Sequence, residues 1–325
     1  MPDVLIVTPV APDSLTGNGI TARRWAGILE RLGSRTTIGE RYDGQPCEML
    51  VALHAQRSAS SVAKFKEDHP DRPLLVALTG TDLYGDLAQD KDVCSSLEQA
   101  SHLIVLQARG PDALPEHLRP KARVIYQSAS APPNLEGPPE SGFDVCVLGH
   151  LRPVKAPFLA EAAARLLPAS SQVRILHLGA ALDDESAAAA RAKESENPRY
   201  HWHGTLPHPD AMRFLARCHL HVLTSEMEGA ANAISEAMTL AVPTVATRIA
   251  GCVGMLGADY PGLFPVGDAE ALASLMHRAE TDAAFYALLR SRCRERAHLV
   301  DPDREFEAWE ALLNEIRSRN GRESG

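Results

Sequence analysis

Two glutamates in the second half of the chain are separated by seven residues and carry its clearest chemical pattern. Glu228 lies in a Gly/Ala-rich loop, and Glu236 lies in a helix expected from Ala230 to Leu240. The apolar runs on either side, Leu220–Leu223 and Pro243–Ala246, predict buried parallel strands. The loop therefore belongs at the carboxyl edge of a sheet, where α/β proteins bind their ligands.

The start of this helix offers backbone amides that suit a phosphate. Asn232 is the predicted N-cap, since its side-chain oxygen can accept a first-turn amide. Carboxylates beside a phosphate repel it unless they face neutral groups such as sugar hydroxyls. The combination indicates a sugar nucleotide. For Glu236 alone, the alternative is a first-turn carboxylate that only stabilises the helix dipole.

A second pattern, Arg152-x-x-Lys155, lies between the strand expected at Phe143–Leu148 and the helix expected at Pro157–Leu167. An arginine fork and a lysine point charge at a helix start are suited to holding a diphosphate. Two solvated loop cations remain the alternative.

The N-terminal half contains a glycine loop, Gly17-Asn18-Gly19, after the strand expected at Val4–Val10. GNGITA with Glu40 matches a dinucleotide fingerprint. Six residues, one of them proline, separate its first glycine from the strand, which disfavours NAD binding and leaves an oxidoreductase as a distant alternative. The loop and Arg24 are candidates for holding an anion, or Arg24 lies on a solvated helix face. His54 and the segment Thr79-Gly80-Thr81 follow two further buried strands, at positions that favour function.

Alternating strands and helices predict an α/β protein with two doubly wound domains. Four prolines and two glycines in 131–142 indicate a linker. We predict an N-terminal domain at 1–132, a linker at 133–142, a second domain at 143–302 and a C-terminal helix within 303–325.

The overall composition disfavours several classes of partner. A net charge of −9 without a basic block argues against nucleic-acid binding, and no apolar run approaches a membrane span. Six scattered cysteines suit reduced thiols in the cytoplasm, and no spacing predicts a metal site. The Asp301-Pro302-Asp303 motif fits a helix cap better than a metal site.

The donor pattern resembles family 4 glycosyltransferases of the GT-B fold. The resemblance rests on Ser225-x-x-Glu228-Gly229, Glu236-Ala237-Met238 and GHLRPVK. It implies two Rossmann-like domains facing across a cleft, a last helix that crosses back to the first domain, and metal-independent sugar transfer. In that family Glu228 would lie beside the donor sugar, Glu236 would bind the ribose, and Arg152 and Lys155 would stabilise the leaving diphosphate. The remaining donor-binding positions would be Gly149, His150, His203, Gly204, Ala231, Asn232, Ala233, Ile234 and Ser235.

Over nearly its full length the chain resembles the selenosugar synthases of selenoneine biosynthesis. The resemblance rests on TPVAPDSLTGNGITARRWAGIL, ALTGTDLY and VIYQSA. It implies transfer of N-acetylglucosamine or glucose from a UDP-sugar to selenophosphate, forming a C–Se bond and releasing UDP without a cofactor. Thr79 stands where related enzymes have a histidine. Transfer to an ionised acceptor can proceed without that histidine, because such an acceptor needs no general base. The acceptor site would comprise Gly17, Asn18, Gly19, Arg24, His54, Thr79, Gly80 and Thr81. A small-metabolite hydroxyl is the alternative acceptor, and a homodimer is possible.

Overall fold

The computed structural model describes residues 2–11, 14, 16–85, 87 and 90–323, with the side chains of 319–323 left out. The last two residues of the predicted C-terminal segment therefore lie outside the described residues. The chain forms two compact units. The first contains Met1–Gln127, Glu228–Ala230 and Pro302–Gly325, and the second contains Ser128–Met227 and Ala231–Asp301.

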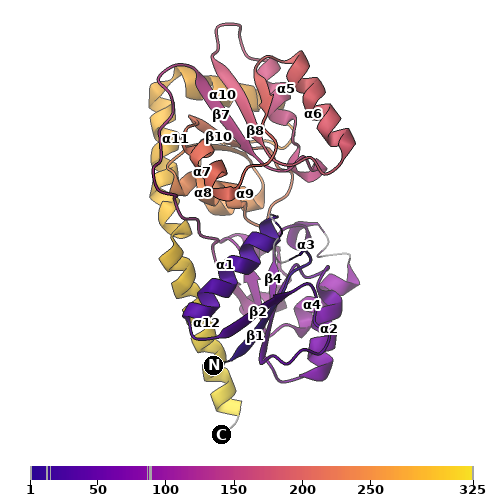
Figure 1. Ribbon diagram of the computed structural model, residues 1–325. Helices are drawn as coiled ribbons and strands as arrows, with labels where there is room; N and C mark the ends of the chain where they lie inside the picture. Colours follow the sequence, from indigo (N-terminus) through magenta and orange to yellow (C-terminus); the bar gives the residue numbers. More distant parts are fainter. Residues whose placement is uncertain (1, 12–13, 15, 86, 88–89, 324–325) are drawn as a thin grey trace. The chain divides into compact units, whose positions relative to one another are not determined.

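The first unit is built on a six-stranded parallel sheet in the order β2-β1-β3-β4-β5-β6 (Figure 1). Its strands are β1 Asp3–Val7, β2 Arg35–Gly39, β3 Met49–Leu53, β4 Leu74–Leu78, β5 His102–Val105 and β6 Ala122–Val124. Its helices are α1 Gly17–Arg31, α2 Ala59–Asp68, α3 Thr81–Tyr84, α4 Lys91–Gln99 and α12 Pro302–Glu323, with short 3₁₀ turns at Gly110–Ala113 and Glu116–Lys121.

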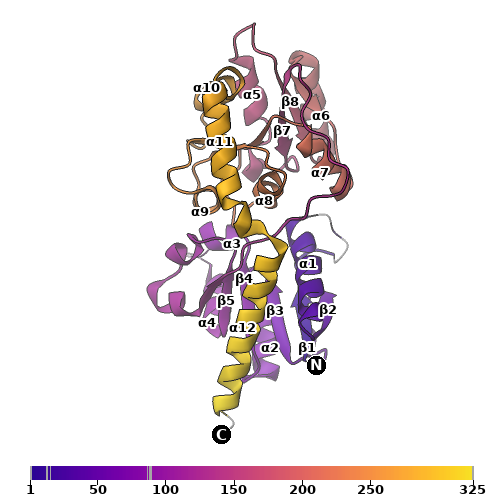
Figure 2. The same ribbon diagram turned by 90° about the vertical axis from the view of Figure 1, so that its left-hand side faces the viewer.

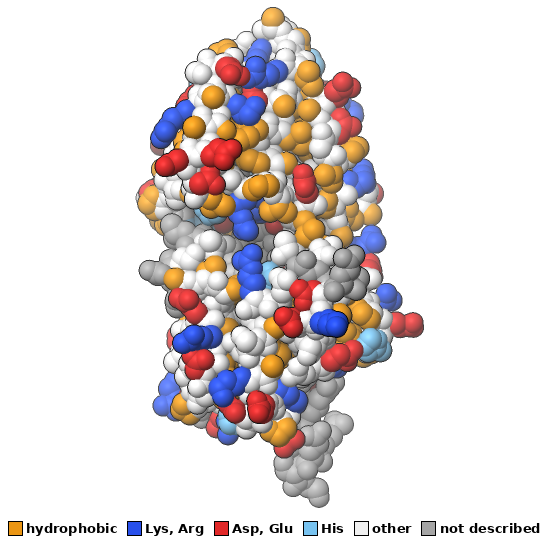
Figure 3. Space-filling view, turned by 90° about the vertical axis from the view of Figure 1, so that its right-hand side faces the viewer, with side chains coloured by type: hydrophobic (Ala, Val, Ile, Leu, Met, Phe, Trp, Pro, Cys, Tyr) orange, Lys and Arg blue, Asp and Glu red, His pale blue; other side chains and the backbone are white. Residues whose placement is uncertain are grey.

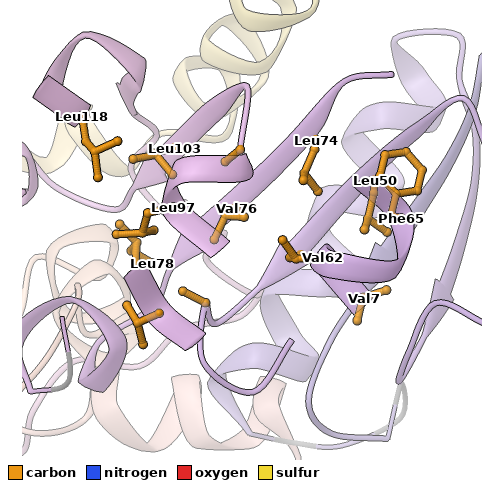
Figure 4. Close-up of a cluster of buried hydrophobic side chains, with 14 of the residues drawn as sticks. Val7, Leu50, Val62, Phe65, Leu74, Val76, Leu78, Leu97, Leu103 and Leu118 are labelled. Carbon is orange, nitrogen blue, oxygen red and sulfur yellow. The ribbon is translucent and has the colours of Figure 1, made fainter. Parts of the chain in front are cut away.

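The core of this unit forms where α2 and α4 cover one face of the sheet. The central strands β3 (MLVAL) and β4 (LLVAL) are buried at every residue, as expected for a parallel sheet that has helices on both faces. Figure 4 shows how Val62 and Phe65 of α2 pack over Leu50 and Leu74.

The second unit is built on another six-stranded parallel sheet, in the order β12-β11-β10-β7-β8-β9. Its strands are β7 Phe143–Leu148, β8 Val173–Leu178, β9 Tyr200–Trp202, β10 Leu220–Leu223, β11 Thr244–Thr247 and β12 Leu263–Phe264. Its helices are α5 Leu159–Arg165, α6 Asp184–Glu196, α7 His208–Ala216, α8 Asn232–Thr239, α9 Ala250–Leu256, α10 Ala269–Thr281 and α11 Ala283–Arg296, with 3₁₀ turns η3 Pro153–Lys155 and η4 Ala297–Val300.

The C-terminal helix α12 belongs to the first unit, which confirms the predicted return of the chain (Figure 2). Its apolar stripe includes Trp309, which is fully buried and meets the ring of Trp25 on α1 edge to face at 5.0 Å. The indole Nε1–H of Trp25 donates to the buried carboxylate of Glu305 at 2.7 Å. An aromatic contact and a buried acceptor thus fix α12 to α1.

Two predictions near helix starts, the separate glycine loop at 17–19 and the N-cap Asn232, are wrong. Helix α1 begins at Gly17, so Gly17-Asn18-Gly19 form its first turn and are not a separate turn before it. The N-cap of α8 is Ala231, and Asn232 is the first helical residue. Its side chain cannot cap a turn to which its own backbone already belongs.

Candidate active site

The second sheet reverses its strand order between β7 and β10. The chain leaves β7 to form β8 and β9 on one side, and then β10, β11 and β12 on the other. In such sheets ligands bind at the carboxyl ends of the strands at this reversal. A small pocket lies there, lined by residues that include Gly149, His150, Lys155, His177 and Ser225.

Hydrogen bonds hold the loops after β7 and β10 together. The amide of Glu226 donates to the carbonyl oxygen of Val154 at 2.9 Å, and the Thr224 hydroxyl donates to that of Lys155 at 2.8 Å. Thr247 at the end of β11 donates to the Ser225 carbonyl at 2.6 Å. The backbone carrying Arg152 and Lys155 is therefore fixed to the chain segment that leads toward α8.

A buried histidine supports the first of these loops from below. His177 on β8 donates through Nε2 to the Gly149 carbonyl at 3.0 Å and accepts through Nδ1 from the Tyr200 hydroxyl at 2.9 Å. Burial lowers the pKa of His177 to about 4, so the ring is neutral at physiological pH. A Cβ on Gly179 would lie 1.8 Å from the same Gly149 carbonyl, so only glycine fits there.

The imidazole of His150, a predicted donor-site residue, is held by a backbone amide. Its Nδ1 accepts the amide of Ala180 at 3.0 Å, which leaves the hydrogen of the neutral ring on Nε2. Burial lowers the pKa of His150, and the charges of Lys155 and Arg152 lower it further. The loop thus presents two cations beside a neutral N–H donor, an arrangement suited to an anion.

The segment after β9 closes on the same loops. The amide of Gly179 donates to the Gly204 carbonyl at 2.7 Å, and Trp202 Nε1–H donates to the Gly179 carbonyl at 2.9 Å. Gly204 has a φ of 64°. His203 packs edge to face on Phe214, and burial lowers its pKa. His203 and Gly204 therefore lie in the same loop cluster as Gly149 and His150.

At the start of α8 the amides of Ile234 and Ser235 both donate to the Ala231 carbonyl, at 2.9 and 3.4 Å. Helix geometry leaves the amides of Asn232 and Ala233 as the first-turn donors for a ligand. One helical turn beyond Asn232, the carboxylate of Glu236 is 13% exposed and meets His208 Nε2 at 2.9 Å. Glu236 is therefore held by the first residue of α7.

In the first unit the sheet reverses between β1 and β3, which places the glycine turn of α1 and His54 after the two strands that flank the reversal. A Cβ on Gly19 would lie 2.4 Å from the Ser14 carbonyl, so this glycine is required for packing.

The guanidinium of Arg24 is bound by the buried carboxylate of Glu305, with Nε at 2.9 and 3.2 Å from its oxygens. This contact ties Arg24 to helix α12 of the same unit. The proposed role of Arg24 in anion binding stays a prediction.

His54, Thr81 and Asp82 converge at the ends of β3 and β4. His54 Nε2 lies 3.0 Å from the Thr81 hydroxyl. The fully buried Asp82 carboxylate accepts the amides of Ala55, Thr79 and Gly80 at 2.8, 3.0 and 2.8 Å. Asp82 was not among the predicted site residues, although its position directly after Gly80-Thr81 could have indicated it.

A family model and several solved structures are similar to this chain. Residues 142–282 match the model of the family Glycosyl transferases group 1. Sucrose-phosphate synthase from Thermosynechococcus elongatus is 16% identical, with a TM-score of 0.79 over 98% of this chain and 99% of that chain. HepE from Anabaena, solved in complex with UDP, is 16% identical, with a TM-score of 0.77 over 97% and 100%. The pneumococcal O-GlcNAc transferase GtfA, in complex with UDP and GlcNAc, is 14% identical, with a TM-score of 0.67 over 82% and 56%.

This protein has the GT-B fold. The two similar sheets, the return of α12 and the full-length likeness to solved glycosyltransferases agree on that assignment. The GT-B units divide the predicted site residues between them. The first contains Gly17–Arg24, His54, Thr79–Thr81 and Glu228, and the second contains Gly149–Lys155, His203, Gly204 and Ala231–Glu236.

Several properties of the described part of this GT-B chain bear on its ligands. No group of three or more histidine, cysteine or acidic side chains there could hold a metal ion. None of the described helices is both long and apolar enough to cross a membrane. All six cysteines are free thiols, five of them buried. On the face drawn in Figure 3, lysines and arginines lie interspersed with acidic side chains.

Proposed function

We propose that this protein is a glycosyltransferase that moves N-acetylglucosamine or glucose from a UDP-sugar to selenophosphate. The UDP-sugar part of this proposal is supported by the strand reversal of the second unit. There Arg152, Lys155 and the neutral His150 N–H lie on one loop, hydrogen-bonded to the loop that leads to Glu236. Such a site suits a nucleoside diphosphate joined to hydroxyl-bearing sugars. Complexes of similar GT-B proteins with UDP support the same donor class.

In the proposed reaction a selenium lone pair of selenophosphate forms a bond to the anomeric carbon. The bond between that carbon and the β-phosphate oxygen breaks, and its electron pair leaves with UDP. Arg152 and Lys155 stabilise the charge that develops on this oxygen. No proton has to leave the acceptor, because selenophosphate is already ionised. Glu228 and Glu236 would bind hydroxyls of the donor.

Selenophosphate as the acceptor rests on the sequence resemblance and on the polar edge of the first unit. That edge offers the hydroxyls of Thr79 and Thr81 and a histidine. A hydroxyl-bearing metabolite is the competing acceptor, and it would require a group able to remove a proton.

The test is a mass-spectrometric assay of the purified protein with UDP-N-acetylglucosamine, with and without selenophosphate. We expect UDP release that depends on selenophosphate, and a sugar product with a selenium isotope pattern. A rise in Tm on adding UDP, without selenium transfer, would retain the donor site and reject this acceptor. Absence of UDP binding would reject the donor assignment, and quenching of NADH fluorescence would then favour a dehydrogenase.

A further inference from the structure

His54 has an unusual backbone conformation at the end of β3. Its φ is 72°, in the left-handed region that residues with a Cβ seldom adopt. Such a conformation is strained and persists where neighbouring groups enforce it. The enforcing group here is Asp82, which accepts the amide of Ala55, the next residue along the chain, at 2.8 Å. The same carboxylate lies 3.9 Å from His54 Nδ1.

Asp82 also fixes the neighbouring strand end. Its other oxygen accepts the amides of Thr79 and Gly80, at 3.0 and 2.8 Å. One fully buried carboxylate thus holds the loops after β3 and β4 in a single arrangement. That arrangement places the His54 ring against Thr81.

The hydrogen bonds of the ring determine the direction of the contact with Thr81. The amide of Arg57 donates to His54 Nδ1 at 3.4 Å, which makes Nδ1 an acceptor. The ring hydrogen therefore lies on Nε2 and is donated to the Thr81 hydroxyl oxygen at 3.0 Å. Because that oxygen already accepts a hydrogen bond, the hydroxyl hydrogen of Thr81 is directed to another partner.

We propose that His54, held by Asp82, is a positioning residue that presents the Thr81 hydroxyl as a hydrogen-bond donor to an anionic acceptor. The proposal rests on the proposed function and deepens it, because it names the residues that select an ionised acceptor. With Nε2 protonated and Nδ1 bonded to a backbone amide, the ring does not take a proton from an alcohol. An acceptor that is ionised in solution needs only a hydrogen-bond donor, which the Thr81 hydroxyl supplies.

The kinetic test compares Thr81→Val, His54→Ala and the double variant. We expect each single change to raise the KM for selenophosphate about tenfold, the value of one hydrogen bond to a charged group. The double variant should be no worse than either single one, because both remove the same contact. The KM for the UDP-sugar should stay unchanged. If the increases in the KM for selenophosphate multiply in the double variant, or if the KM for the UDP-sugar rises by as much, the proposal is overturned.

Two further variants separate positioning from a structural role. His54→Gln keeps an N–H donor and is expected to recover part of the affinity for selenophosphate that His54→Ala loses. His102→Gln removes another buried histidine from the same sheet, at the start of β5, and should leave the KM unchanged. If His54→Gln and His54→Ala behave alike, the ring only supports the fold.

A measurement without turnover keeps this proposal distinct from the proposed function. A long-range ¹H–¹⁵N spectrum of the histidine rings, assigned with His54→Gln, reports which ring nitrogen carries the hydrogen. We expect the Nε2–H form, and the Nδ1–H form would overturn the proposal. If the wild type binds UDP but does not use selenophosphate, the proposed acceptor falls, while the ring form still decides whether His54 can donate to Thr81.

Discussion

The strand edges of the two units share a topology and differ in chemistry. In the second unit the loops at the reversal carry Arg152 and Lys155, beside histidines that burial keeps neutral. In the first unit the central charge is the buried Asp82, whose carboxylate accepts three backbone amides, and the arginine expected there is held by Glu305. The same sheet reversal therefore supports a cationic edge in one unit and, in the other, an edge built around a buried acid that backbone amides balance.

The largest expected effect concerns the scaffold of the first unit. Glu305→Ala would leave the Arg24 charge and the Trp25 N–H without their buried partner. We expect a loss of about 3–5 kcal/mol in the free energy of unfolding, because breaking a buried pair strands a charge. Urea unfolding measures it. Glu307→Ala, which removes an exposed acid from the same helix, is the control and should change stability little. If the two variants lose the same free energy of unfolding, the contact with Glu305 does not make Arg24 a scaffold residue.

The cationic edge is tested by Arg152→Ala. If Arg152 stabilises the leaving diphosphate, kcat should fall about 10²–10³-fold, as for other preorganised donors. Steady-state release of UDP measures the effect. Arg213→Ala removes an exposed arginine that pairs within α7 and should leave kcat unchanged. A wild-type kcat in Arg152→Ala would remove the functional contrast between the two edges.

His177 makes the stability of the second unit depend on pH. Its pKa is about 4 in the folded protein and about 6.5 in the unfolded chain, so the unfolded chain binds more protons between these values. Its contribution is complete above pH 6.5 and is lost as the pH falls toward 4, by about 2 kcal/mol between pH 7 and 5. We expect His177→Gln to reduce the pH dependence of urea unfolding by that amount. His298→Gln, at an exposed histidine, should leave it unchanged.

The smallest effect is expected at Glu236. If its carboxylate accepts hydroxyls of the ribose, Glu236→Ala should raise the KM for the UDP-sugar about tenfold while kcat changes little. Glu226→Ala, at an exposed acid of the neighbouring loop, serves as the control. A wild-type KM in Glu236→Ala would leave the carboxylate as the partner of His208 alone.

The fold and the placement of the loops after β7 and β10 followed from local patterns. The run Leu74–Leu78 is apolar on both faces, and Phe143–Leu148 is apolar except at Asp144; this property predicts buried parallel strands. Arg152-x-x-Lys155 was recognisable because the chemistry and the loop position occur in one continuous segment. The N-cap of α8 was predicted wrongly, since Asn232 is a good capping residue and nothing local shows that Ala231 has that position.

Contacts between distant segments were decided by tertiary structure alone. Arg24 and Glu305 are separated by 281 residues, and no local pattern indicates that the last helix carries a buried acid to that arginine. Asp82 reads as a first-turn acid in the sequence, yet packing buries it, so its charge is balanced by amides from two strand ends. The sequence therefore determined which residues could do chemistry. Burial and long-range pairing decided which of them serve the scaffold.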